Sequence, residues 1–119
     1  MTVISVRRMT PQIGKTELAT SRVRTMAGIV ATAGGRVRIG QVVAGEGAGC
    51  MQLYAAFTDF MSISKATLAI AADPARVKLL HERELNPAGE VVGPEVYRTV
   101  FGDVAPDYPV IMQREYRLP

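Results

Sequence analysis

The chain has 119 residues, 48% of them hydrophobic and 21% charged, which fits a single globular domain over residues 1–119. Such a chain can bury a core without disulfides or a metal, so disordered, collagen-like and disulfide-stapled classes are excluded. The net charge of +3 comes from 14 basic and 11 acidic residues, and the longest basic run is Arg7-Arg8. Because nucleic-acid surfaces need a basic stripe with interleaved aromatic residues, we expect no nucleic-acid partner.

The cysteine and histidine counts limit the compartment and the metal chemistry. Cys50 is the only cysteine, so no internal disulfide can form and a reducing, cytoplasmic location is expected. His81 is the only histidine, so the nitrogen and sulfur ligands of a usual zinc site are missing and no metal is expected. The N-terminal charges follow the apolar residues, which is the reverse of a signal peptide. No window reaches the roughly 18 apolar residues of a membrane-spanning helix, so no membrane partner is expected.

The first half of the chain predicts a strand, a long helix and a hairpin. Residues 2–9 are rich in β-branched side chains and predict a strand. Over residues 14–33 apolar side chains recur at helical spacing, and Gly34-Gly35 stops the helix. Residues 36–44 and 51–58 both alternate between apolar and polar side chains, and the glycine-rich segment 45–49 joins them. This pattern predicts two half-buried strands in a β-hairpin.

The next segment predicts a helix with a bend. Asp59 or Ser62 can cap its start. Asp73-Pro74 is a second helix-start signal, with aspartate as the cap and proline at the first helical position. We therefore expect the helix to break or bend there and to continue to about Glu84, with a turn at residues 86–89.

The C-terminal segment predicts further strands. Residues 95–101 combine helical i, i+4 pairs with strand-forming residue types, and we favour a short extra strand. Residues 102–109 are predicted as a loop and residues 110–118 as the final strand. The resulting β-α-β-β-α-(β)-β order predicts an α+β, ferredoxin-like split βαβ fold, with the helices on one face of an antiparallel sheet.

The strand patterns predict that the second face of this sheet is also covered. A sheet buried on one side only should be polar on the other. Val3 and Ile4 point to opposite faces of the first strand, and Val110 and Ile111 do the same on the last. A chain of this size has too few helices to cover both faces. We expect a second copy to cover the open one, which makes the protein a homodimer.

In its length and element order the chain resembles the dimeric α/β-barrel superfamily. The helix start Asp59-Phe60-Met61-Ser62 after the third strand and the closing strand at 109–116 add to this resemblance, which covers nearly the whole chain. The superfamily includes antibiotic-biosynthesis-type monooxygenases, muconolactone-isomerase-like enzymes and NIPSNAP-type proteins. Its two ferredoxin-like subunits press their sheets together around a central cavity. The resemblance carries no catalytic motif, and it implies a small-molecule cavity between the two sheets.

Strand alternation predicts which polar side chains would line such an inter-sheet cavity. A tyrosine and an arginine facing an apolar cavity can bind or polarise a carbonyl or carboxylate group. Gln113 with Glu115, or Arg114 with Tyr116, would face inward from the last strand, depending on its register. The candidates are Arg38, Tyr54, Thr58, Arg114 and Tyr116. Each of these residues could equally be an ordinary surface side chain or a side chain at a subunit contact, without a role in ligand binding.

Histidine and glycine signals give further candidates. His81 is a candidate general base or haem ligand. The alternative is that it only stabilises the helix, because a histidine near the C-terminal end interacts favourably with the helix dipole. The resembling superfamily has haem-binding branches, so haem is an alternative to the expected lack of any cofactor. The segment 45–50 is similar to a dinucleotide-binding glycine motif, but a strand follows where a helix is required. Its glycines are therefore interpreted as turn formers.

Two functions from different classes fit these observations. The first is a homodimer that binds or converts a small organic molecule in an inter-sheet cavity. Its activity would resemble isomerisation or cofactor-free oxygenation, in which the substrate supplies the electrons and few catalytic side chains are needed. The second is a non-enzymatic homodimeric ligand-binding or structural module. A lumen that contains Tyr54 and an arginine favours the first function, and a lumen filled with aliphatic side chains favours the second.

Overall fold

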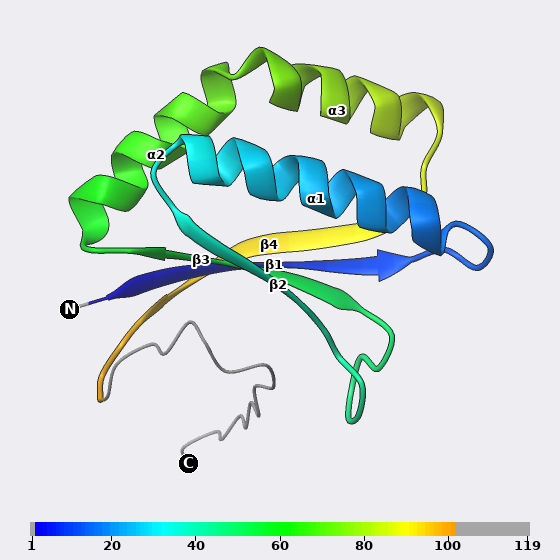
Figure 1. Ribbon diagram of the computed structural model, residues 1–119, viewed down its shortest axis with the longest axis horizontal. Coiled ribbons are helices and arrows are strands. Elements are labelled where there is room, and N and C mark those ends of the chain that lie inside the picture. Colours follow the sequence, from blue (N-terminus) through cyan, green and yellow to red (C-terminus); the bar gives the residue numbers. More distant parts are fainter. Residues whose placement is uncertain (1, 102–119) are drawn as a thin grey trace.

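Within residues 2–101, three helices cover one face of a four-stranded antiparallel sheet (Figure 1). The computed structural model describes residues 2–101. The strands follow the order β2-β3-β1-β4 across the sheet, which together with the two-layer arrangement is the ferredoxin-like fold that the element order predicts. The elements are β1 (Val3–Pro11), α1 (Thr16–Thr32), β2 (Arg36–Gln41), β3 (Met51–Phe57), α2 (Phe60–Ala72), α3 (Pro74–Leu85) and β4 (Gly89–Arg98).

The fourth place in the sheet belongs to β4, which is longer than the short extra strand predicted over residues 95–101. It pairs with β1 from Pro11↔Gly89 to Val3↔Arg98, so it runs along the whole free edge of β1. The ladder shifts register between Val6 and Arg8, opposite Gly93 and Pro94 of β4. This irregularity interrupts the apolar–polar alternation, which is why the sequence pattern hides the first half of the strand. The strand predicted at 110–118 lies outside the described residues.

The helix ends follow the predicted signals. After α1, Gly34 has a φ of +108°, and the N–H groups of Gly34 and Gly35 donate to the carbonyls of Ala31 and Val30. This is the Schellman arrangement, which needs a glycine in the left-handed region. The break between α2 and α3 falls at Asp73-Pro74, where the Asp73 carboxylate accepts from the backbone N–H of Ala75 at 2.9 Å.

The core lies between the helices and one face of the sheet, to which β1, β2 and β3 contribute their odd-numbered residues. Val3 pairs with Phe57 and Met9 pairs with Met51, and all four side chains are buried. The apolar stripe of α1 packs onto them, with Val30 fully buried. The even-numbered positions of β1, β2 and β3 therefore point away from the helices, and so do Glu95 and Tyr97 of β4, whose parity changes at the register shift. None of the helices in residues 2–101 is long and apolar enough to cross a membrane.

A buried arginine joins α1 to the end of α3. Arg22 is only 7% exposed, and its two Nη groups donate to the backbone carbonyls of Asn86 at 2.6 Å and Glu82 at 3.3 Å. Lys15 reaches the same place, where its Nζ donates to Asn86 Oδ1 and to the Pro87 carbonyl. Arg22 thus supplies the Asn86 carbonyl with a donor and adds a second to the Glu82 carbonyl, which already accepts from the Asn86 backbone N–H. Both cations lie at the C-terminal end of α3, where a positive charge complements the helix dipole.

Candidate functional site

The sheet face turned away from the helices brings Arg38 and Tyr54 together. The two residues are direct register partners on β2 and β3, so their side chains leave the same face side by side. Val6 is the partner of Tyr54 on the other side, on β1. We call this surface the outer sheet face. Among the described strands it consists of Ile4, Val6, Arg8, Thr10, Arg36, Arg38, Gly40, Gln52, Tyr54, Ala56, Glu90, Val92, Glu95 and Tyr97.

A buried glutamine connects Tyr54 to a second arginine. Gln52 is only 6% exposed and is the register partner of Arg8. With its amide oriented to satisfy both neighbours, Gln52 Oε1 accepts from Arg8 Nη2 at 2.7 Å and Nε at 3.2 Å, while Nε2 donates to the Tyr54 hydroxyl. The phenol is thus held by a side chain that is itself fixed by an arginine, so its position on the sheet is well defined.

The environment of Tyr54 keeps the phenol neutral at neutral pH. Burial of the ring raises its pKa, and the positive charges of Arg8 and Arg38 act in the opposite direction. A neutral phenol is a hydrogen-bond donor as well as an acceptor. Combined with two guanidinium groups, it forms a polar centre suited to a carbonyl or carboxylate oxygen.

The edge of the outer sheet face carries a second tyrosine. Tyr97 lies opposite Ile4, and Glu95 lies opposite Val6, in the β1–β4 ladder. The Tyr97 hydroxyl donates to the Glu95 carboxylate. This carboxylate is on the same face as the arginines, so the face is of mixed charge rather than uniformly basic.

The remaining candidates from the sequence lie elsewhere. Thr58 follows the end of β3 and is exposed, with its hydroxyl 3.1 Å from Ser62 Oγ at the start of α2. His81 is an exposed residue of α3, on the helix layer rather than the outer sheet face. Arg114 and Tyr116, and their alternatives Gln113 and Glu115, lie outside the described residues. The structure therefore brings two of the five cavity candidates, Arg38 and Tyr54, into one cluster.

The sequence prediction missed Arg8 and Gln52 as members of this cluster. Gln52 lies two positions before Tyr54 on the same strand, so strand alternation already places both side chains on the same face. The sequence therefore contained the information needed to include Gln52. Arg8 required the β1–β3 register, since only that pairing places it opposite Gln52. Glu95 and Tyr97 required the extent of β4, which the irregularity at Gly93 hides.

Cofactor and metal signals are sparse in the described part of the chain. Within residues 2–101 there is no group of three or more His, Cys, Asp and Glu side chains that could hold a metal ion. The glycine segment 45–49 forms the β2–β3 connection, and Gly45, Gly47 and Gly49 all have positive φ. These glycines serve the turn, in line with their interpretation from the sequence. Cys50 follows them, buried and 3.3 Å from Thr10 Oγ1.

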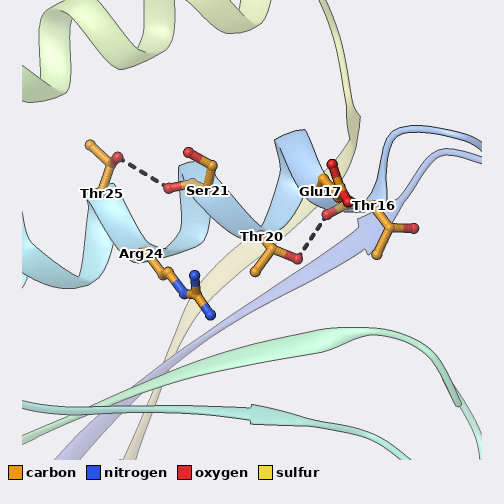
Figure 2. A pocket seen from close by; sticks show the side chains of 6 residues that line it. All are labelled: Thr16, Glu17, Thr20, Ser21, Arg24 and Thr25. Carbon is orange, nitrogen blue, oxygen red and sulfur yellow. Dashed lines mark hydrogen bonds between the residues drawn. The ribbon is translucent and has the colours of Figure 1, made fainter.

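A shallow depression on α1 does not have the character of a ligand site. Its described lining is confined to one side of that helix, from Thr16 to Thr25, as Figure 2 shows. Two of its hydroxyls are used by the helix itself, since Thr20 donates to the Thr16 carbonyl and Thr25 to that of Ser21. Ligand sites usually combine an apolar floor with convergent polar groups from several elements, and this depression offers neither.

Solved structures share this fold at low sequence identity. An uncharacterised NIPSNAP domain protein from Burkholderia xenovorans is 16% identical with a TM-score of 0.63, over 86% of this chain and 99% of that one. A NIPSNAP family protein from Agrobacterium tumefaciens is 13% identical with a TM-score of 0.66, over 88% and 100%. SnoaB, a cofactor-independent oxygenase from Streptomyces nogalater, is 18% identical with a TM-score of 0.55, over 89% and 98%.

These matches establish the fold. The chain has the ferredoxin-like α/β architecture of NIPSNAP-domain and antibiotic-biosynthesis-monooxygenase-like proteins, as the resemblance in its sequence predicts. No protein-family model matches the chain, and no curated protein matches it either. At these identities the likeness concerns architecture, and chemistry must be argued from the residues themselves.

Proposed function

We propose that this chain binds or converts a small organic molecule on its outer sheet face, and that two copies enclose that molecule between their sheets. The main support for this proposal is the position of Tyr54, which lies beside Arg38 and is linked through Gln52 to Arg8. A phenol and two guanidinium groups on a partly apolar surface favour a ligand with a carbonyl or carboxylate oxygen. SnoaB, which shares the fold, is a cofactor-independent oxygenase, so the fold is compatible with conversion of a small organic molecule.

The apolar part of the same face supports the second copy. Ile4 and Val6 are partly exposed and share the outer sheet face with the polar cluster, and none of the described helices packs there. Val92 adds an apolar side chain that is 49% exposed. Apolar surface of this kind favours burial by association, and a twofold pair of identical faces is the simplest way to bury it.

A non-enzymatic role is the second candidate, and one observation favours it. His81, the one histidine of the chain, is on an exposed face of α3 and is remote in the fold from the outer sheet face. The outer sheet face thus has no imidazole base, so the same cluster fits a binding module or a structural interface. A ligand that is recovered unchanged after incubation would favour this candidate over conversion.

The experiment is to place a charge in the middle of the proposed interface. Tyr54→Arg adds a third guanidinium next to Arg8 and Arg38, and a second copy would have to bury it without a partner. We expect light scattering to report a dimer for the wild type and a monomer for this variant. Thr25→Arg, on the exposed side of α1, adds the same charge elsewhere and should remain dimeric. A Tyr54→Arg protein that stays fully dimeric would contradict the proposed interface.

A further inference from the structure

A separate cavity between the helices and the sheet is surrounded by arginines. Its volume is about 160 Å³, and it lies under α3, bordered by α1, β1 and β4. Five arginines line it: Arg7 and Arg8 of β1, Arg22 of α1, and Arg76 and Arg83 of α3. No aspartate or glutamate is among its described lining residues. We call this site the arginine pocket. It belongs to the helix side of the sheet, whereas the Tyr54 cluster belongs to the outer face.

Within residues 2–101 no carboxylate in the lining of the arginine pocket balances its cations, and Arg7 and Arg76 repel each other. Burial, and after it the charge of Arg76, lowers the pKa of Arg7. No hydrogen bond or ion pair joins the guanidinium of Arg7 or Arg76 to the described part of the chain. The two Nη groups of Arg22 are taken up by helix carbonyls, while its Nε is a buried donor with no acceptor in residues 2–101. Like charges held together in a partly desolvated site destabilise the fold unless an anion joins them.

The rest of the lining is apolar. Met26 of α1, Leu79 of α3 and Val91 of β4 contribute side chains from three elements. Leu79 is 6% exposed, so this floor is part of the core rather than open surface. An apolar cavity on the order of 150 Å³ is large enough to hold a benzene ring. The pocket therefore has room for the apolar part of a small ligand next to the arginine side chains.

We propose that the arginine pocket is a binding site for a small organic carboxylate, an anion with an aromatic or short aliphatic body. The carboxylate lies between Arg7 and Arg76, where planar guanidinium groups bind its two oxygens, and the apolar body enters between Met26 and Leu79. Inorganic anions lack the apolar body, and neutral aromatic compounds lack the charge, so both bind more weakly. This site is distinct from the one proposed on the outer sheet face, because it uses none of Arg38, Gln52 and Tyr54. Arg8 borders both sites, and its guanidinium is held by Gln52.

The test measures binding of sodium benzoate to the full chain by protein-observed NMR, with benzamide and inorganic phosphate as matched probes. Benzoate should shift the amides of Leu80 and Gly93, which border the pocket, and the two probes should bind at least about tenfold more weakly. Arg76→Gln should weaken benzoate binding by about 10- to 100-fold, as expected for the loss of a charge-assisted hydrogen bond. Arg24→Gln, on the exposed side of α1, removes one charge outside the pocket and should leave benzoate affinity unchanged.

A second variant separates binding from folding. Arg7→Met removes a partly buried cation that repels Arg76, so we expect it to leave the free protein as stable as the wild type or more stable, while benzoate binding is lost. A purely structural arginine would show the opposite, with lower stability on removal. The proposal is overturned if benzamide or phosphate binds as well as benzoate, if Arg76→Gln binds normally, or if benzoate produces no shifts.

Discussion

Arg7 and Arg8 are neighbours in the chain, yet their side chains lie on opposite faces of β1. Arg7 pairs in register with Leu53 of the core and borders the arginine pocket, while Arg8 pairs with Gln52 and donates to its amide on the outer sheet face. Both residues border the arginine pocket, but only Arg8 places its guanidinium on the outer sheet face, where Gln52 accepts from it. Strand alternation alone produces this difference, since successive side chains point to opposite sides.

The hydrogen bonds of the buried Arg22 should contribute strongly to the stability of the contact between α1 and α3. Arg22→Met leaves the Asn86 and Glu82 carbonyls without their charged donors, so the free energy of unfolding should fall by about 2–4 kcal/mol. Urea denaturation followed by circular dichroism measures this difference. Arg24→Met, on the exposed side of the same helix, should change the unfolding free energy by less than about 0.5 kcal/mol. Equal effects of the two substitutions would show that the Arg22 contacts do not stabilise the fold.

The start of α2 should make stability depend on pH through Asp59. Its carboxylate accepts from the Ser62 backbone N–H at 2.7 Å, and this bond, with a second from the Ser62 side chain, lowers the pKa of Asp59. A lowered folded-state pKa means that the stabilisation is present above the unfolded carboxyl pKa and is lost as the pH falls through the folded value. Asp59→Ala should therefore melt below the wild type at neutral pH, and the gap should close in acid.

Asp59→Asn is the matched control for this pH dependence, because an asparagine caps a helix without a titratable group. Its melting temperature, measured by circular dichroism across the same pH series, should differ from that of Asp59→Ala by a constant amount. A wild-type advantage over Asp59→Ala that stays constant into strong acid would rule out the ionised cap as its source.

Two glycines should respond in opposite directions to alanine. Gly93 has a φ of +110°, and a Cβ there would lie 2.7 Å from the Val6 carbonyl oxygen, so Gly93→Ala should destabilise the fold by about 1–3 kcal/mol. Gly28 lies within α1 with open space around it, and Gly28→Ala should raise the unfolding free energy by up to about 1 kcal/mol. Chemical denaturation of both variants checks the pair. A stable Gly93→Ala protein would mean that β4 does not approach β1 as described.

Tyr54 should titrate above the usual phenol range of about 10. Burial is the larger influence on its pKa, and Arg8 and Arg38 partly offset it, so Arg38→Met should raise the pKa of Tyr54 further. A raised folded-state pKa also means that this group's contribution to stability is present below the unfolded phenol pKa and is lost as the pH rises through the folded value. Ultraviolet titration, with Tyr54→Phe subtracted, measures the shift. A lower Tyr54 pKa in Arg38→Met would contradict the placement of these two side chains.

Much of the fold could be predicted because its signals are local. The apolar spacing of α1, the glycines after it and the Asp73-Pro74 break all reflect contacts within a few residues, and the structure confirms them. The face shared by Arg38 and Tyr54 also follows from alternation along two neighbouring strands. Where the alternation is interrupted, at Gly93, the prediction fails and β4 is longer than expected.

The arginine pocket could not be predicted in the same way. Arg7, Arg22 and Arg76 are far apart in the sequence, and they meet only because α3 packs against α1 above the β1–β4 edge. Local patterns report which side of an element a residue occupies, but they do not report which elements become neighbours. The same limit applies to Arg8 and Gln52, whose contact depends on the register between β1 and β3.

Native mass spectrometry of the purified full chain tests the central claim most directly. The chain has a mass of 12.8 kDa. We expect a species near twice that mass, carrying a small additional mass that is released when the protein is denatured. A bare dimer would support the second copy and would fit either a vacant site or a filled, structural interface. A monomer at every concentration would contradict the account, because the outer sheet face with Tyr54 would then have no second copy to enclose a ligand.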